Sequence, residues 1–339
     1  HAVIARAHGG RALHAAQQRD LAEILAWRQA RSHDVCAIGA MYADWTQHGA
    51  GVTNYLSVPE MPMDTQGTAF NLPGGYIENA DLNTFTAISD FNSEFFKFGV
   101  KESVKHSWYK NGWTRHPYDE TTEPDYTDFQ DDGKYSWVKS PTFNDKPAQV
   151  GPLANVLCMY AAGHEPTKKY VQLVLDTVSS LAGANVGPSA LHSTIGRHAA
   201  RAIRAAVLYD ELNTQWQALV DNIAKGELQT YTPYNFPAGE IRGFGFHEAP
   251  RGTLSHWTVI DNGKIKNYQA VVPSTWNAGP RNQNDALGPY EASLIDNPVA
   301  DPERPLEVVR TIHSFDPCLA CAIHMVDAQG RPIVQVKAL

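Results

Sequence analysis

The sequence predicts an α+β fold that is mainly helical, with long helices in a central bundle and irregular, β-containing layers. Apolar side chains recur at helical spacing in residues 167–182 and 189–225. Residues 50–165 instead hold many Pro, Gly, Asn and Asp residues among scattered aromatics, without strong periodicity. With 339 residues and 43% hydrophobic content, the chain can build a substantial core in one large domain or two ordinary ones.

The first elements are predicted to be one helix followed by strands and loops. Residues 11–30 place Leu21, Ile24 and Leu25 on one helical face, which indicates an amphipathic helix. Residues 50–165 should form short strands and long ordered loops. Their aromatic content argues against disorder, because long disordered stretches are usually poor in aromatics.

Two helical segments follow. Residues 167–182 form the first, and Thr167 is expected to cap it directly after Pro166. Residues 189–225 predict one or two long helices that end at Gly226, a residue type that commonly terminates helices.

The remaining elements are strands. The runs "SHWTVID" and "KIKNYQAVV" flank Asn262-Gly263, a dipeptide that strongly favours a two-residue hairpin turn. The last segment also has the pattern of a strand, a "GRP" turn and a second strand.

Charge and composition exclude some functions. The formal net charge is -8, and no basic segment points to nucleic acid. No stretch approaches the ~20 apolar residues that a membrane span needs, so attachment to a membrane would come through a partner. Four cysteines in so long a chain do not indicate a disulfide framework.

Only two of the cysteines form a motif, Cys318-x-x-Cys321, with His324 three residues further on. This spacing fits a thiol-redox pair, half of a zinc site or two core cysteines. A haem attachment site would need His where Ala322 stands. Structural zinc usually takes four protein ligands, and only three are evident here.

Further motifs surround this pair. Asp316-Pro317 precedes it, and "GFHEAPRGTLSHW" (245–257), "YQAVVPSTWNAGPR" (268–281), "YSWVKSP" (135–141) and "VGPLAN" (150–155) lie upstream. Together they resemble the large subunit of nickel–iron hydrogenases, in particular the membrane-bound uptake type. The resemblance runs from about residue 70 to the end.

The resemblance implies a nickel–iron centre with carbonyl and cyanide ligands on the iron, held by four cysteine thiolates. Cys318 and Cys321 match one pair of these thiolates, with Cys321 in the place that bridges both metals. Soft thiolates suit nickel. If the pair lies on a helical turn, both sulfurs share one face.

It also implies roles for residues around the metals. Arg251 matches an arginine over the open metal position, where its fixed charge polarises dihydrogen, and Asp316 matches its carboxylate partner. Cys318 or Arg251 would take the proton. Pro273 and Ser274 match the contact with a diatomic ligand. From the residues alone, Arg251 could be a surface arginine in a turn, and Asp316 an N-cap on the turn that carries the cysteines.

The same resemblance implies a magnesium ion near the metal pair. His324 and the backbone carbonyl of Ala270 match two of its ligands, and Lys139 and Gln269 match residues around them. Nitrogen is an unusual donor for so hard a cation, so the residues alone would not suggest magnesium.

The Arg-x-Cys-Gly-x-Cys motif that supplies the other two nickel ligands in this family does not occur in the sequence. We therefore expect residues 1–324 to be the C-terminal part of a longer subunit, forming a single domain that is inactive alone. Residues 325–339 match an extension that an endopeptidase removes during maturation by cutting between His324 and Met325.

The function that the resemblance implies is heterolytic cleavage of dihydrogen for hydrogen uptake. Electrons would pass to an iron–sulfur small subunit, and through it to a membrane cytochrome b. Nickel-insertion chaperones and the maturation endopeptidase would act earlier. The complex would be peripheral to the membrane on its periplasmic face. Two alternatives are a non-catalytic relative from the respiratory quinone oxidoreductases and a zinc or thiol-redox module built on the cysteine pair.

Overall fold

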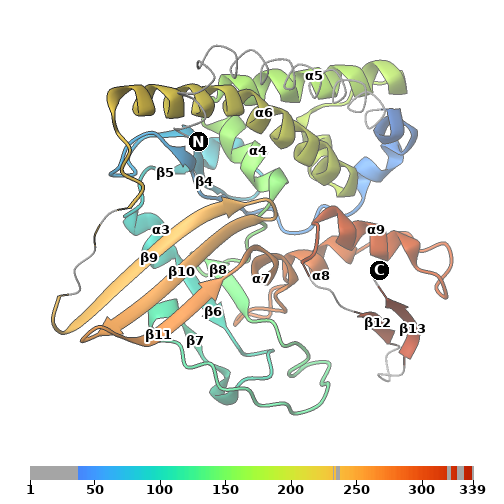
Figure 1. The fold of residues 1–339 in the computed structure, drawn as a ribbon. Coiled ribbons are helices and arrows are strands. Elements are labelled where there is room, and N and C mark those ends of the chain that lie inside the picture. Colours follow the sequence, from blue (N-terminus) through green and yellow to red (C-terminus); the bar gives the residue numbers. More distant parts are fainter. Residues whose placement is uncertain (1–36, 232, 234–236, 319–321, 327–331, 338–339) are drawn as a thin grey trace.

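Small antiparallel sheets build the first part of the chain. The computed structural model describes residues 37–231, 233, 237–318, 322–326 and 332–337, so the helix expected at 11–30 lies outside it. The strand orders are β1-β4-β5, β2-β3 and β7-β6-β8. In Figure 1, β4 and β5 lie above β6, β7 and β8. These short strands confirm the prediction for this region. Their bounds are β1 (Tyr55–Ser57), β2 (Glu60–Pro62), β3 (Phe70–Leu72), β4 (Gly74–Ile77), β5 (Thr86–Ile88), β6 (Val100–Ser103), β7 (Thr114–Arg115) and β8 (Ser140–Phe143).

Short helices lie between these strands and within the helical layer that follows. They are η1 (Ala43–Gln47), η2 (Leu82–Thr84), α3 (Glu94–Gly99), η3 (Lys110–Gly112), η4 (Pro117–Asp119) and η5 (Pro188–Leu191).

Three helices pack on one another and cover the β-sheets: α4 (Pro152–Ala161), α5 (Glu165–Ala182) and α6 (Thr194–Lys225). The predicted long helix is the single helix α6, which ends as expected at Gly226 in a left-handed conformation. The prediction that Thr167 caps α5 is wrong. The cap is His164, because Pro166 is favourable in the first turn and the helix already includes it.

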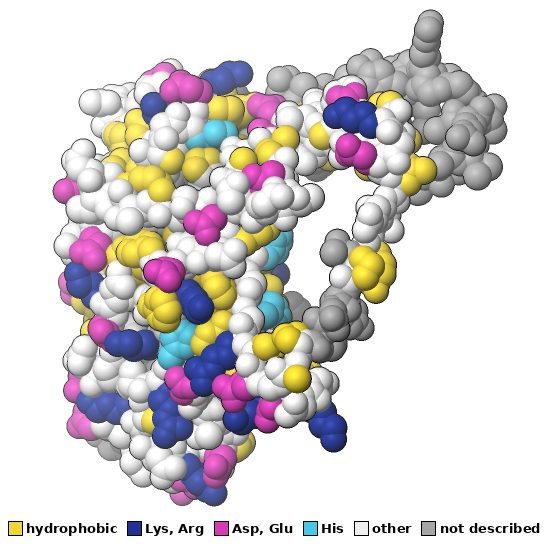
Figure 2. All heavy atoms as spheres, turned by 90° about the vertical axis from the view of Figure 1, so that its left-hand side faces the viewer, with side chains coloured by type: hydrophobic (Ala, Val, Ile, Leu, Met, Phe, Trp, Pro, Cys, Tyr) yellow, Lys and Arg dark blue, Asp and Glu magenta, His cyan; other side chains and the backbone are white. Residues whose placement is uncertain are grey.

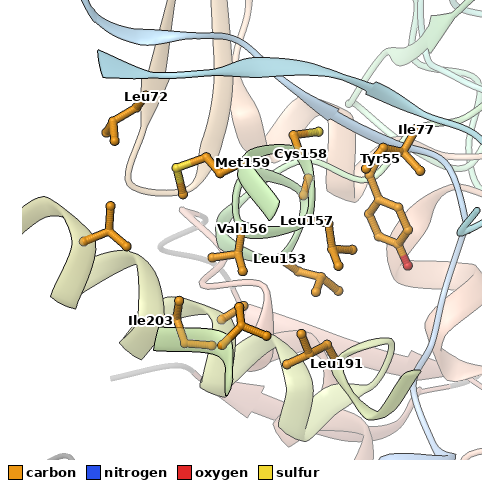
Figure 3. Close-up of a cluster of buried hydrophobic side chains, with 14 of the residues drawn as sticks. Tyr55, Leu72, Ile77, Leu153, Val156, Leu157, Cys158, Met159, Leu191 and Ile203 are labelled. Atoms are coloured by element: carbon orange, nitrogen blue, oxygen red, sulfur yellow. The ribbon is translucent and has the colours of Figure 1, made fainter. Parts of the chain in front are cut away.

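The core surrounds α4, which the sequence pattern did not predict. Residues 152–159 are buried without a break. Figure 3 shows Leu153, Val156, Leu157 and Met159 of this helix inside the cluster of buried hydrophobic side chains. Side chains from β1, α5 and α6 close around it, including Tyr55, Val171 and Ile203. A helix that is buried on all sides lacks the exposed polar face that gives an amphipathic period, so the sequence pattern did not indicate it.

A long three-stranded sheet follows in the order β11-β10-β9. It consists of β9 (Glu240–Ala249), β10 (Gly252–Asp261) and β11 (Lys264–Val271). The hairpin predicted at Asn262-Gly263 is confirmed, and both turn residues have positive φ, 47° and 78°. Trp257 of β10 packs on Phe96 in a second, aromatic-rich core.

The chain then forms α7 (Pro273–Ala278), α8 (Pro289–Leu294), α9 (Leu306–Ser314) and the pair β12 (Ala322–Val326) and β13 (Pro332–Lys337). The last two strands are antiparallel, as the sequence predicted. The expected mixed α+β class is thus confirmed.

Two surface properties agree with the composition. On the face shown in Figure 2, acidic and basic side chains are intermixed and do not form a basic patch. Within the described ranges, the helices are too short or too polar to cross a membrane.

Candidate functional site

Arg251 lies at the tip of the β9–β10 hairpin. Ala249 pairs with Gly252 across the two strands, so Pro250 and Arg251 form a two-residue turn. The long paired arms beneath this turn fix the direction in which the chain presents Arg251.

Two glycines hold this tip against the start of α4. Gly252 has a φ of 125°, and a Cβ atom placed on it would come within 2.4 Å of the backbone nitrogen of Gly151. Gly151 caps α4 with a φ of 114°. Only glycine tolerates both the conformation and the close approach. These contacts bring the motifs "EAPRG" and "VGPLAN" together in space.

Asp316, which lies just after α9, contacts the Arg251 side chain. It follows α9 in a left-handed conformation, with a φ of 57°. The Nε atom of Arg251 donates to the Asp316 backbone oxygen at 2.9 Å, and Nη2 donates to Oδ1 at 3.3 Å. The two side chains are 38% and 40% exposed, so the pair lies at an accessible surface. The two residues that the resemblance pairs with each other are therefore in contact in the structure.

Cys318 lies beside this pair as a free, exposed thiol. Its backbone N–H donates to the Oγ atom of Ser274 at 3.2 Å. Ser274 and Pro273 are both buried in the first turn of α7. Cys318 is not in a helix, so the helical turn expected to start there is absent at this residue, and Cys321 lies outside the described residues.

A buried charged cluster forms below β11. The Nζ atom of Lys139 lies 2.5 Å from Oε2 of both Glu102 and Glu120, and 3.2 Å from Oε1 of Gln269. Burial alone would lower the pKa of Lys139, but the two carboxylates raise it. Burial, together with Glu102, raises the pKa of Glu120 to about 9. Lys139 and Gln269, which the resemblance places around a magnesium ion, contact each other in this cluster.

Donors for a hard cation lie around this cluster. The Oε1 atoms of Glu102 and Glu120 are buried and have no hydrogen-bond partner among the described residues. Ala270 is the neighbour of Gln269 in β11 and pairs with His256. His324 and Met325 lie in β12, of which the structure describes the backbone but not the side chains. Oxygen donors of this kind fit magnesium.

The sequence did not single out two further residues near Asp316. Arg201 of α6 donates from Nη2 to the Ser314 oxygen at 2.9 Å. The Oη atom of Tyr290 in α8 is buried without a partner in the described part of the chain. Burial raises its pKa, and Asp316 adds to the effect. Helical spacing relative to Arg197 and Arg204 could have marked Arg201, whereas nothing marked Tyr290.

A large apolar cavity lies elsewhere in the described part of the chain. It has a volume of about 710 Å³ and lies between η1, α5 and α6, with an apolar lining that includes Trp45, Val174 and Ile203. No group of three or more His, Cys, Asp or Glu side chains within the described ranges is arranged to hold a metal. Of the two cysteines expected to hold nickel, the structure describes Cys318, and its free, exposed thiol fits one ligand of a thiolate-bound metal.

Comparisons with known proteins agree on one family. A sequence profile described as nickel-dependent hydrogenase matches residues 17–324. The hydrogenase-2 large chain of Escherichia coli K12 is 53% identical over 307 residues, covering 90% of this chain and 54% of that protein. The quinone-reactive Ni/Fe-hydrogenase large chain of Wolinella succinogenes is 38% identical over 309 residues, covering 85% and 51%. The chain spans about half the length of the curated relatives it matches.

Solved structures show the same fold. A [NiFeSe]-hydrogenase from Dm. baculatum superimposes with a TM-score of 0.71 at 28% identity, covering 90% of this chain and 58% of that chain. The Ni-Fe-Se hydrogenase from D. vulgaris Hildenborough gives a TM-score of 0.67 at 27% identity, covering 88% and 58%.

Proposed function

Because this chain belongs to the nickel-dependent hydrogenase family, we propose that it forms the C-terminal catalytic part of a hydrogenase large subunit. The proposed reaction is the heterolytic cleavage of dihydrogen to protons and electrons. The observation that carries the proposal is the contact of Arg251 with Asp316, two residues before the free thiol of Cys318.

The ligands would come from the segment after α9. Cys318 and Cys321 would hold a nickel–iron centre with carbonyl and cyanide ligands, together with two thiolates from outside this chain. The centre, when bound, would supply the redox chemistry that splits dihydrogen. Pro273 and Ser274 would line the side of a diatomic ligand, and the Ser274 hydroxyl already fixes the Cys318 backbone.

Arg251 would supply a permanent positive charge at the place of reaction. Its guanidinium carries a fixed positive charge, and its planar fork keeps a fixed orientation. Asp316 supports this orientation from the backbone oxygen and the carboxylate. The proton of the reaction would be held at the Cys318 Sγ atom, which is accessible from solvent.

Magnesium would bind near the Lys139 cluster. The proposed ligands are His324 and the carbonyl oxygen of Ala270, with Lys139 and Gln269 around them. The unpartnered Oε1 atoms of Glu102 and Glu120 support a site of this charge type.

We also propose the partners and the location of the complete enzyme. Electrons would pass to an iron–sulfur small subunit, and the complex would dock on a membrane cytochrome b. The relatives named for hydrogen uptake and quinone reactivity support this. The chain would then lie peripheral to the membrane on the periplasmic face, after assembly with nickel-insertion chaperones.

Residues 325–339 would be removed by an endopeptidase that cuts between His324 and Met325. The match to the family profile ends at the same residue, 324, and supports this boundary. Domain 1–324 would be the mature part of the chain.

Hydrogen uptake by the matured complex tests the proposal. A complete large subunit that contains this segment is produced with its small subunit, and dye reduction under dihydrogen is measured alongside nickel and iron content. We expect one nickel per complex and dihydrogen-dependent reduction. A matured complex without nickel would reject the proposal and favour the non-catalytic relative.

A further inference from the structure

Three arginines lie along one face of α6. Arg197, Arg201 and Arg204 are spaced by four and three residues, so they follow one another along one side of the helix. Arg197 and Arg204 are 3% and 5% exposed. Their contacts reach the two chain segments that carry Arg251 and Asp316.

Arg204 holds the segment before Arg251. Its Nη1 atom donates to the Ala249 oxygen at 2.9 Å, and its Nη2 atom donates to the Glu248 oxygen at 3.2 Å. The same Nη2 atom lies 3.0 Å from both carboxylate oxygens of Glu60, which balances the buried charge. The guanidinium therefore clamps the last two residues of β9 to α6, next to the turn that presents Arg251.

Arg201 and Arg197 hold the segment before Asp316. Arg201 donates to the Ser314 backbone oxygen at 2.9 Å, and the Nε atom of Arg197 donates to the Ser314 Oγ atom at 2.7 Å. The Arg197 guanidinium also lies 3.8 Å above the ring of Phe315. These contacts fix the end of α9, directly before Asp316.

One helix thus fastens both sides of the Arg251–Asp316 contact. We propose that Arg201 and Arg204 are positioning residues that set the relative place of Arg251 and the Asp316–Cys318 segment. The inference rests on the function proposed above. Errors of about 1 Å in placing a reacting group can cost a hundredfold in rate, so a clamp on each side has a direct kinetic consequence.

Kinetics of the matured complex provide the first test. The variants are Arg201→Met and Arg204→Lys, which keeps a charge beside Glu60 but loses the two-carbonyl fork. The control is Arg304→Met, at a residue that is 84% exposed. Each clamp variant should lower kcat about tenfold, with nickel content unchanged and KM for dihydrogen within about twofold. Arg201→Lys should restore part of the loss, and the control should match the parent.

A double-mutant cycle tests whether Arg201 acts through Asp316. Positioning predicts that Arg201→Met adds little to the effect of Asp316→Asn, because both remove the same arrangement. Fully additive losses would overturn the proposal, since they would show that Arg201 acts elsewhere.

Hydrogen–deuterium exchange on the 339-residue chain tests the clamps without turnover. Arg201→Met should speed exchange at least about threefold in residues 315–318, and Arg204→Lys should do so in 247–253. Equal acceleration in α4 would mean a general loss of stability and would overturn the proposal. If the parent complex shows no hydrogen uptake, the proposed function fails, while this exchange pattern still decides the positioning role.

Discussion

The Nε atom of Arg251 lies 2.9 Å from the backbone oxygen of Asp316, although 65 residues separate the two in the chain. The contact joins the tip of a rigid hairpin to the segment that continues into Cys318. A hydrogen bond through Nε fixes the orientation of the planar guanidinium and therefore of its two Nη groups.

Arg251→Lys should abolish most hydrogen uptake while leaving nickel content unchanged. A lysine keeps the charge, but its single ammonium group cannot reproduce the fork that contacts Asp316 at two points. A charged donor misplaced by about 1 Å at a reacting centre can lower kcat by about a hundredfold. Dye reduction under dihydrogen measures the effect, with Arg304→Lys as the control. Unchanged kcat would remove Arg251 from the mechanism.

Cys318→Ser should give a complex without nickel, because a hydroxyl is a poor ligand for a metal that prefers soft thiolates. Cys158→Ser is the matched control. Cys158 is buried, and its thiol donates to the Gly75 oxygen at 3.3 Å, a bond that serine can keep. Elemental analysis should find nickel in the Cys158 variant and none in the Cys318 variant. Nickel retained by Cys318→Ser would contradict the proposed ligand set.

Periodicity predicted the exposed parts of the fold better than the buried ones. α5 and α6 carry a polar face and were found, whereas α4 is buried over residues 152–159 and lacks the amphipathic pattern. β9 was missed because Gly243 and Gly245 weaken its strand character.

Sequence motifs predicted the residues of the candidate site, but they did not predict the residues that contact and position them. Arg251, Asp316, Ser274 and Cys318 come from four short motifs, and the structure brings them together. Glu102, which reaches Lys139, had no local signal because that contact bridges distant parts of the chain. Such convergence depends on tertiary packing, which spacing along the sequence does not encode.

Glu248→Gln should flatten the pH dependence of stability. Burial raises the pKa of Glu248 from its ordinary 4.5 to about 8 in the folded chain, against the opposing charge of Arg204. The folded chain therefore holds a proton that the unfolded chain releases, so the free energy of unfolding falls as pH rises through this window. The loss is up to about 1.4 kcal/mol per pH unit.

Urea unfolding of the parent chain and the Gln variant between about pH 5 and pH 8 measures this difference. The parent should lose stability more steeply than the variant. Parallel curves would mean that Glu248 titrates alike in both states.

Gly252→Ala should destabilise the chain far more than an alanine at another glycine with positive φ. At Gly252 a Cβ atom would lie 2.4 Å from the Gly151 nitrogen, so the hairpin tip would have to move away from α4. Gly226 also has a positive φ, of 81°, but a Cβ atom there would meet nothing within 4 Å. Its alanine variant should cost only about 1 kcal/mol in strain.

The clash at Gly252 adds to a similar strain, and we expect a total of about 4 kcal/mol or more, in the range that marks a severe local defect. Urea midpoints at constant slope give both values. Because the displaced tip carries Arg251, Gly252→Ala should also lower kcat in the matured complex at full nickel content, whereas Gly226→Ala should not. Equal costs at the two glycines would show that the contact with Gly151 does not constrain the tip.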